Sequence, residues 1–273
     1  MNLNAYTNNH QLIFLSNLST NRTVGDSVIT PVIVRVPTVR YNIAYKLCEL
    51  RDNSLMHLLS ECWRKYKFDE NLQERIVIFC RKKETVQEMN AFLNGSSFIT
   101  TMSTLYTGDL TEEERSTNMQ AFSNEESETR IMVATKAFGM GMDYASIRLV
   151  IHLHSPETML DYVQESGRAG RDGKKSEAVL LFDQSDLKSK FVSEEMKRMI
   201  QDDSACLRTP VSLEMDGEYS CCLILPKAEP CSRCSTLMPA DNCQNKTVPA
   251  ETQKDANPRS VGIECYEASR MTS

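Results

Sequence analysis

The stretch RIMVATKAFGMGMDYASIRLVIH, residues 130–152, holds two short apolar runs on either side of a glycine-rich turn. The runs are RIMVA (130–134) and IRLVIH (147–152). Similar runs occur on both sides of this stretch: RIVIF (75–79), STLY (103–106) and EAVLLF (177–182). Apolar runs of four to six residues without strict alternation indicate strands that are buried on both faces.

Helical patterns separate these strands. They cover Glu84–Leu93, Thr111–Phe122 and Thr158–Ser166. Alternation of strand and helix is typical of βαβ units. Residues 75–184 are therefore predicted to form an α/β domain with a doubly wound parallel sheet.

The flanking segments differ in composition. Residues 1–30 are rich in Asn, Ser and Thr and are expected to be poorly ordered. Residues 31–74 contain the extended piece PVIVRVP and two amphipathic stretches, Ile43–Leu50 and Leu55–Tyr66, which are expected to be helices. Residues 185–236 are predicted to form a subdomain with a helix over 185–203 and a cysteine module, and residues 237–273 a disordered tail.

Composition excludes several classes of protein. The chain has 273 residues, with 31 Lys and Arg against 37 Asp and Glu, so a polycationic binder is excluded but a local basic groove is not. No apolar run approaches the roughly 18 residues of a membrane helix, and the start of the chain lacks the features of a signal peptide. We expect an intracellular protein whose ten cysteines are free or bound to metal, with no membrane partner.

The turn after RIMVA contains Thr135, Gly139, Gly141 and Asp143. Its glycines allow close approach of a ligand to the backbone, the threonine can bond a phosphate oxygen, and the aspartate can accept from a sugar hydroxyl or hold an arginine. Read alone, the turn is better explained as a tight βα connection, because one G-x-G is a weak signal.

The next loop is more specific. It reads QESGRAGRDG (164–173) and sets Arg168 and Arg171 three residues apart among Gly167, Gly170 and Gly173. Two guanidiniums on one face of a turn can reach one phosphate cluster, as arginine fingers do in phosphoryl transfer. The alternative is a solvated, flexible loop.

QESGRAGRDG resembles motif VI of superfamily 2 helicases in its RecQ form. ATKAFGMGMD with IRLVIH resembles motif V, RIVIFC with the helix after it resembles motif IV, and VRVPTVRYNIAYKL resembles the segment that leads from the first RecA-like lobe into the second. The resemblance covers about residues 31–234.

This resemblance implies an ATP-dependent 3′–5′ DNA helicase. Arg171 would be the finger on the γ-phosphate, with Arg168 beside it, and Gln164 would couple nucleotide state to DNA contacts. Gly139, Gly141, Asp143, Gly167 and Gly170 would surround ATP with Mg²⁺, Asp143 near the ribose. Thr135 would touch the DNA backbone, and Arg81 and Lys82 follow RIVIFC where a phosphate backbone can pass.

The sequence also departs from the family pattern. It has no G-x-x-x-x-G-K-[ST] and no Asp-Glu-x-His segment, and the ending GKKS in residues 170–176 has the wrong glycine spacing for a P-loop. The histidine of the family's Tyr-His-Ala-Gly-Leu is absent from Tyr106–Leu110. Because arginine fingers need a nucleotide-binding lobe, we expect these residues alone to be inactive and their partner to be a missing first RecA-like lobe.

Seven cysteines crowd the last third of the chain. Cys206, Cys231 and Cys234 are predicted zinc ligands because C-x₂-C lets two sulfurs share one ion, and Cys221 and Cys222 compete to be the fourth, with Cys222 chosen. The RecQ family carries a four-cysteine zinc subdomain directly after its second lobe, which this module resembles. The alternative is reduced thiols in a tail, while Cys48, Cys62 and Cys80 are expected in the core.

Two functions remain open. The first is the carboxyl-terminal portion of a nuclear RecQ-like helicase acting on single-stranded or forked DNA. The second is a non-catalytic, zinc-stabilised nucleic-acid-binding or regulatory module. An RNA helicase fragment is disfavoured by QES before Gly167 and by the cysteines, and His152 with His154 is expected in the core or at its rim.

Overall fold

The computed structural model describes residues 3–8, 11–16, 39–96, 101–139 and 144–237. The strands are β1 (Leu3–Asn8), β2 (Gln11–Ser16), β3 (Ile43–Glu49), β4 (Arg75–Cys80), β5 (Met102–Tyr106), β6 (Thr129–Ala134), β7 (Ile147–Leu153) and β8 (Ser176–Phe182). The helices are α1 (Ser54–Lys65), α2 (Lys83–Gly95), α3 (Glu112–Ser123), the 3₁₀ turn η1 (Lys136–Gly139), α4 (Met159–Ser166), α5 (Gln184–Lys188), α6 (Glu194–Gln201), α7 (Arg208–Asp216) and α8 (Ser232–Leu237).

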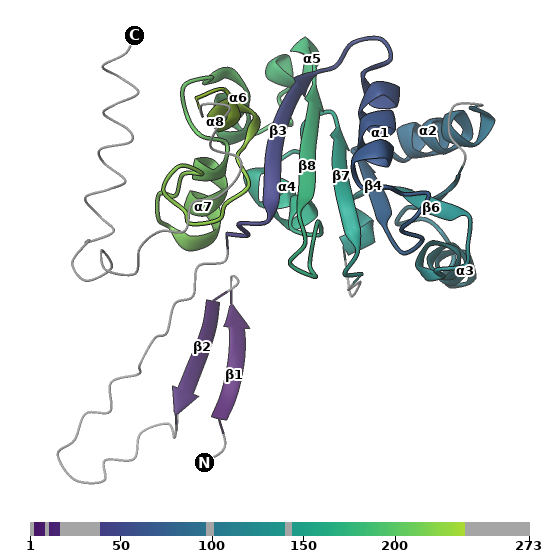
Figure 1. Ribbon diagram of the computed structural model, residues 1–273, viewed down its shortest axis with the longest axis horizontal. Coiled ribbons are helices and arrows are strands. Elements are labelled where there is room, and N and C mark those ends of the chain that lie inside the picture. The colour runs from purple at the N-terminus through teal and green to yellow at the C-terminus, as the bar shows by residue number, and fades with distance from the viewer. Residues whose placement is uncertain (1–2, 9–10, 17–38, 97–100, 140–143, 238–273) are drawn as a thin grey trace, which may run out of the picture.

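Six strands form one parallel sheet in the order β3-β8-β7-β4-β6-β5 (Figure 1). From the central β4 the chain runs to the β5 edge, returns through β6, and crosses to β7 and β8. Such a reversal of winding direction produces a doubly wound sheet. The predicted fold class is therefore confirmed.

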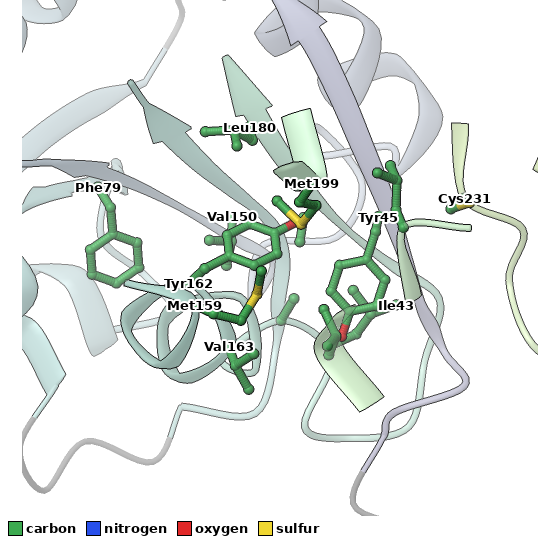
Figure 2. Close-up of a cluster of buried hydrophobic side chains, with 14 of the residues drawn as sticks. Ile43, Tyr45, Phe79, Val150, Met159, Tyr162, Val163, Leu180, Met199 and Cys231 are labelled. Carbon is green, nitrogen blue, oxygen red and sulfur yellow. The ribbon is translucent and has the colours of Figure 1, made fainter. Parts of the chain in front are cut away.

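The sheet is covered on both faces, as the unbroken apolar runs predict. Alternate residues of β4 belong to two separate cores: Ile76, Ile78 and Cys80 pack with α1 and α2, whereas Val77 and Phe79 pack with α3 and α4. The second core continues past β3 into the cysteine module, where Cys231 lies beside Tyr45 and Ile43 (Figure 2). The module is thus attached to the sheet through one continuous core.

The three early cysteines are core residues, as expected, although Cys48 is only half-buried. Burial raises the pKa of the Cys80 thiol to about 12. A thiol in apolar surroundings with a raised pKa is a poor nucleophile. These cysteines therefore act as small apolar side chains.

Two expectations from the sequence are wrong. Ile43–Glu49 forms the edge strand β3, because the free side of β8 is available to pair with it from Ile43↔Ser176 to Glu49↔Phe182. In place of one helix over 185–203 there are two, because Asp183 and Ser193 each cap a separate helix start. Within residues 1–30, β1 and β2 pair as antiparallel strands. Most of this segment lies outside the described residues, so its expected poor order stays a prediction. The predicted tail from residue 238 lies outside the described residues.

Candidate functional site

The arginine loop, residues 167–175, lies at the amino edge of the sheet. Sequence reasoning looked for ligand sites after the carboxyl ends of strands. The loop lies elsewhere because α4 carries the chain from the carboxyl edge back to the start of β8. Gly170 donates its N–H to the carbonyl of Ile147, the first residue of β7, at 2.7 Å, and Ser176 donates to the Asn42 carbonyl at 3.0 Å.

Gly170 fixes the path of this loop. Its φ is +57°, in the left-handed region that favours glycine. A Cβ there would lie 2.4 Å from Ser176 Oγ, 2.5 Å from Asn42 Nδ2 and 2.7 Å from the Lys174 carbonyl oxygen. Asn42 Nδ2 donates to the carbonyls of Gly170 and Lys174, each at 2.8 Å. The loop is closed around the amide of Asn42, with no space for a side chain at Gly170.

A buried ion-pair network holds the other side of the loop. The guanidinium of Arg148, on β7, is 2% exposed and lies 2.5 Å from Asp172 Oδ2. It also bonds the buried carboxylate of Glu74 and donates to Ser176 Oγ at 3.0 Å. Loss of one partner of a buried pair leaves an uncompensated charge, which is strongly destabilising. The network therefore fixes Asp172, the neighbour of Arg171.

The two predicted arginines occupy different environments. Arg171 is exposed, whereas Arg168 is 7% exposed with its Cζ 5.8 Å from the centre of the Phe138 ring in η1. A third arginine, Arg40, donates to the Gly167 carbonyl at 3.2 Å and to the Gly170 carbonyl. Sequence reasoning did not single out Arg40. This residue lies in the segment VRVPTVRYNIAYKL, shortly before β3 begins.

Like charges crowd this edge. Burial lowers the pKa of Arg40 and of Arg168, and in both cases the positive charge of Arg171 lowers it further. An anion beside Arg171 would relieve this repulsion. The three arginines together define the amino-edge arginine cluster: Arg40, Arg168 and Arg171.

The remaining nucleotide-site predictions are only partly described. Gln164 is exposed on the last turn of α4, and Gly167 ends that helix by donating its N–H to the Val163 carbonyl at 2.9 Å. Gly139 ends η1. Gly141 and Asp143 lie outside the described residues. The roles assigned to these residues stay predictions.

The residues predicted to contact DNA lie together at the opposite, carboxyl edge. Thr135 follows β6, and Arg81 and Lys82 follow β4. Lys82 is exposed, but Arg81 is held 3.1 Å from Oδ1 of the fully buried Asp186. Nearby, Lys136 pairs with Glu157 and Lys83 with Asp109, each at 3.3 Å. Most cations that the structure describes at this edge are therefore neutralised locally.

His152 and His154 have separate environments, as expected. His152 is buried and stacks on Phe79, with its Nε2 3.1 Å from Glu165 Oε2. His154 lies at the rim, where its Nδ1 is 3.3 Å from Asp186 Oδ2. The hydrogen bond with Asp186 raises the pKa of His154. Asp186 and Asp183 are occupied as the reciprocal capping box of α5.

The cysteine module gathers the four sulfurs that were predicted. Within the described residues, the Sγ atoms of Cys206, Cys222, Cys231 and Cys234 all lie within 4.8 Å of one another. Cys206 Sγ is 3.5 Å from Cys222 Sγ and 3.8 Å from Cys231 Sγ. Tetrahedral zinc with Zn–S bonds of about 2.3 Å requires sulfurs about 3.8 Å apart, so the donor set fits zinc. Hydrogen bonds from the other three thiols lower the pKa of Cys231, which favours a thiolate.

The sequence of this chain is similar to sequences of known helicases. Residues 53–173 match the helicase conserved C-terminal domain. The chain is 49% identical over 82 residues to the ATP-dependent DNA helicase RecQ of Bacillus subtilis, covering 30% of this chain and 14% of that protein. It is 44% identical over 80 residues to a truncated RecQ DNA helicase-like protein of Schizosaccharomyces pombe, covering 29% of this chain and 54% of that protein.

Residues 53–173 thus match a helicase C-terminal lobe, and the chain is similar to RecQ-named helicases. RNA helicases are similar too: the ATP-dependent RNA helicase DBP3 of Phaeosphaeria nodorum is 32% identical over 136 residues, covering 50% of this chain and 22% of that protein. The chain spans about half or less of the length of these relatives. In the part of the chain that the structure describes, no helix has the length and apolar character needed to cross a membrane.

Proposed function

We propose that this chain contains the second lobe of a RecQ-family, ATP-dependent DNA helicase with 3′–5′ polarity. In this proposal Arg171 reaches the γ-phosphate of ATP bound with Mg²⁺ on a first RecA-like lobe. The observation that carries the proposal is the amino-edge arginine cluster. Burial lowers the pKa of Arg40 and of Arg168, the positive charge of Arg171 lowers both further, and a triphosphate could bind such a cluster through charge-assisted hydrogen bonds.

Each member of the cluster has a different part in this mechanism. Arg171, exposed on the loop, is the only member of the three that extends into solvent and can contact the transferring phosphoryl group. Arg168 packs over Phe138 of η1, so it joins the arginine loop to the segment after β6. Arg40 bonds two loop carbonyls and fixes the backbone from which Arg171 projects. Positioned charge of this kind stabilises a transition state without reorganisation.

DNA is the proposed nucleic acid. QES before Gly167 and the cysteine module support DNA over RNA, and the RecQ-named relatives agree. Thr135 and the exposed Lys82 lie at the carboxyl edge, where a single strand or fork would pass. Because Arg81 is engaged by Asp186, its contact with DNA would require that ion pair to open. We infer an intracellular, nuclear location from the reduced cysteines and this activity.

Zinc is the proposed metal of the cysteine module. Cys206, Cys222, Cys231 and Cys234 would hold it, and a four-sulfur site leaves no open position for catalysis. Its contribution would be folding free energy for a segment of short helices and turns.

A chimaera tests the helicase proposal. The first lobe of B. subtilis RecQ would be joined ahead of residue 31, and DNA-stimulated ATP hydrolysis would be measured. We expect hydrolysis in the chimaera and none above background in the 273-residue chain alone. Arg171→Ala should lower kcat at least about 100-fold, since an arginine finger contributes 10³ or more.

Lys83→Ala is the matched control because Lys83 is an exposed cation at the opposite edge, paired with Asp109. It should change kcat less than about twofold. Robust ATP turnover by the 273-residue chain alone would contradict the proposal, as would a chimaera in which Arg171→Ala retains full activity.

A second candidate function is a non-catalytic, zinc-stabilised module that binds nucleic acid. Two observations favour it: these 273 residues contain no P-loop pattern, and one relative is itself named as truncated. The sequence of the genomic DNA upstream of the codons for these residues discriminates between the two candidate functions. An in-frame P-loop and Asp-Glu-x-His segment would support the helicase, whereas their absence together with salt-sensitive DNA binding would support the module.

A further inference from the structure

Arg208 joins the cysteine module to the segment before β3. It is the first residue of α7, two residues after Cys206, and it is fully buried. Its Nε donates to Cys222 Sγ at 3.4 Å. Its Nη atoms donate to the carbonyls of Arg40 at 2.6 Å, Ile43 at 2.8 Å and Glu229 at 2.9 Å. One guanidinium therefore connects a sulfur of the four-cysteine site with the backbone on both sides of Asn42.

The same short segment holds the arginine loop from its other side. The side chain of Arg40 donates to the carbonyls of Gly167 and Gly170, and Asn42 donates to Gly170 and Lys174. Residues 40–43 are thus bonded by their carbonyls to Arg208 and by their side chains to the loop that carries Arg171. The path runs from Cys222 through Arg208 and Arg40 to Gly170.

Only a guanidinium fits this junction. It presents five N–H groups in one plane, and here it bonds four acceptors while its Cζ lies 5.2 Å from the centre of the Tyr45 ring. A lysine ammonium cannot span four acceptors in a plane.

We propose that Arg208 is a positioning residue that transmits the state of the four-cysteine site to the arginine loop through Arg40. When metal holds Cys222 in place, Arg208 fixes the Arg40 backbone and the loop is ordered. When the metal leaves, Arg208 loses a fixed acceptor and the loop loosens. The proposal rests on the proposed zinc site but requires no helicase activity. The proposed helicase function and the role of Arg208 can therefore fail separately.

Amide hydrogen exchange on the full chain tests it. The reporting amides are Gly170, bonded to Ile147, and Asp172 and Gly173, bonded to Ala145 and Gly170. Removal of zinc by a chelator and the substitution Arg208→Lys should each speed exchange of peptide 167–175 about fivefold. Peptides from β4 and β7 should not change, which shows that the sheet remains folded.

Arg233→Lys is the matched control. Arg233 is in the same module and donates to three backbone carbonyls, those of Met199, Ile200 and Ala205. It should leave exchange of the loop within about twofold of the original chain. The proposal is overturned if Arg233→Lys loosens the loop as much as Arg208→Lys does, if Arg208→Lys leaves it unchanged, or if the chain holds no zinc.

A spectroscopic measurement separates positioning from general loss of structure. In the cobalt-substituted chain, the thiolate-to-metal band reports the hydrogen bond on Cys222. Tripolyphosphate bound at Arg171 should shift this band in the original chain, because coupling between two sites is reciprocal. The shift should vanish in Arg40→Lys and persist in Arg233→Lys. The proposal is also overturned if tripolyphosphate binds to the original chain but does not shift this band.

Discussion

The arginine cluster at the amino edge and the cations at the carboxyl edge lie in different electrostatic surroundings. At the carboxyl edge, Arg81, Lys83 and Lys136 each pair with a carboxylate. At the amino edge, Arg40 and Arg168 lie near another arginine, and their pKa values are lowered by burial and by that neighbour. An anion beside neighbouring positive charges would lower their mutual repulsion, whereas a cation already paired with a carboxylate gains less from a further anion. This comparison is the basis for proposing that a polyanion binds at the amino edge.

The largest effect should come from the cysteine module. Cys231→Ser should reduce zinc from about one per chain to near zero and lower the free energy of unfolding by at least about 3 kcal/mol, since structural zinc contributes folding free energy directly. Metal analysis after dialysis measures the zinc content, and chemical denaturation measures the free energy of unfolding. Cys221→Ser, outside the four-sulfur set, should keep the zinc and cost about 1 kcal/mol. Zinc retained in Cys231→Ser would show that the ligand set is different.

The loop backbone should give the next effect. Gly170→Ala combines a left-handed φ with contacts below 3 Å and should lower the free energy of unfolding by about 3 kcal/mol. Gly173→Ala is the matched control, because Gly173 also has positive φ, +79°, but nothing lies within 4 Å of its added Cβ. It should cost about 1 kcal/mol. Equal costs at the two positions would mean that Asn42 and Ser176 do not confine the loop.

Anion binding tests the comparison directly. Arg171→Ala should weaken binding of tripolyphosphate to the chain at low salt about tenfold, because it removes a charge-assisted contact. Lys136→Ala, at the carboxyl edge, should weaken it less than about twofold, because Lys136 is paired with Glu157. Titration calorimetry measures both. A stronger effect of Lys136→Ala would reverse the assignment of the edges.

The smallest effect should be a pH dependence at the carboxyl edge. His154 faces Asp186, Asp183 and Arg81, and its pKa is raised in the folded chain. A raised folded pKa gives stability that is full below the unfolded pKa and is lost as pH rises through the folded pKa. The contribution should be below about 1 kcal/mol. Urea unfolding between pH 5 and 9 should show a decrease in the free energy of unfolding as pH rises. His154→Gln should remove this dependence on pH. An unchanged slope in His154→Gln would assign it to another group.

The parallel sheet was predictable from local pattern. Unbroken apolar runs such as RIVIF and RIMVA mark strands with two buried faces, and caps such as Thr111 and Thr158 mark helix starts. The C-x₂-C spacing identified Cys231 and Cys234, and the structure supports Cys222 as the fourth ligand. Each of these patterns involves residues close together in the chain, so it can be recognised without knowledge of the fold.

What the sequence could not show are the contacts between distant segments. Ile43–Glu49 is a strand only because β8, more than a hundred residues later, offers an unpaired side. Arg75, Arg148 and Arg208 are among the largest fully buried side chains, although arginine is ordinarily exposed. Their burial depends on carbonyls, carboxylates and a sulfur brought together by tertiary packing.

The sequence by itself determined the class of fold, the loop that carries Arg168 and Arg171, and the C-x₂-C pair of Cys231 and Cys234, because each of these depends on residues close together in the chain. Only the tertiary structure decided which edge holds the arginine loop, that Arg40 joins it, and that Arg208 ties it to the cysteines. Those facts follow from the return of α4 to the amino edge and from the pairing of β3 with β8, which no local pattern encodes.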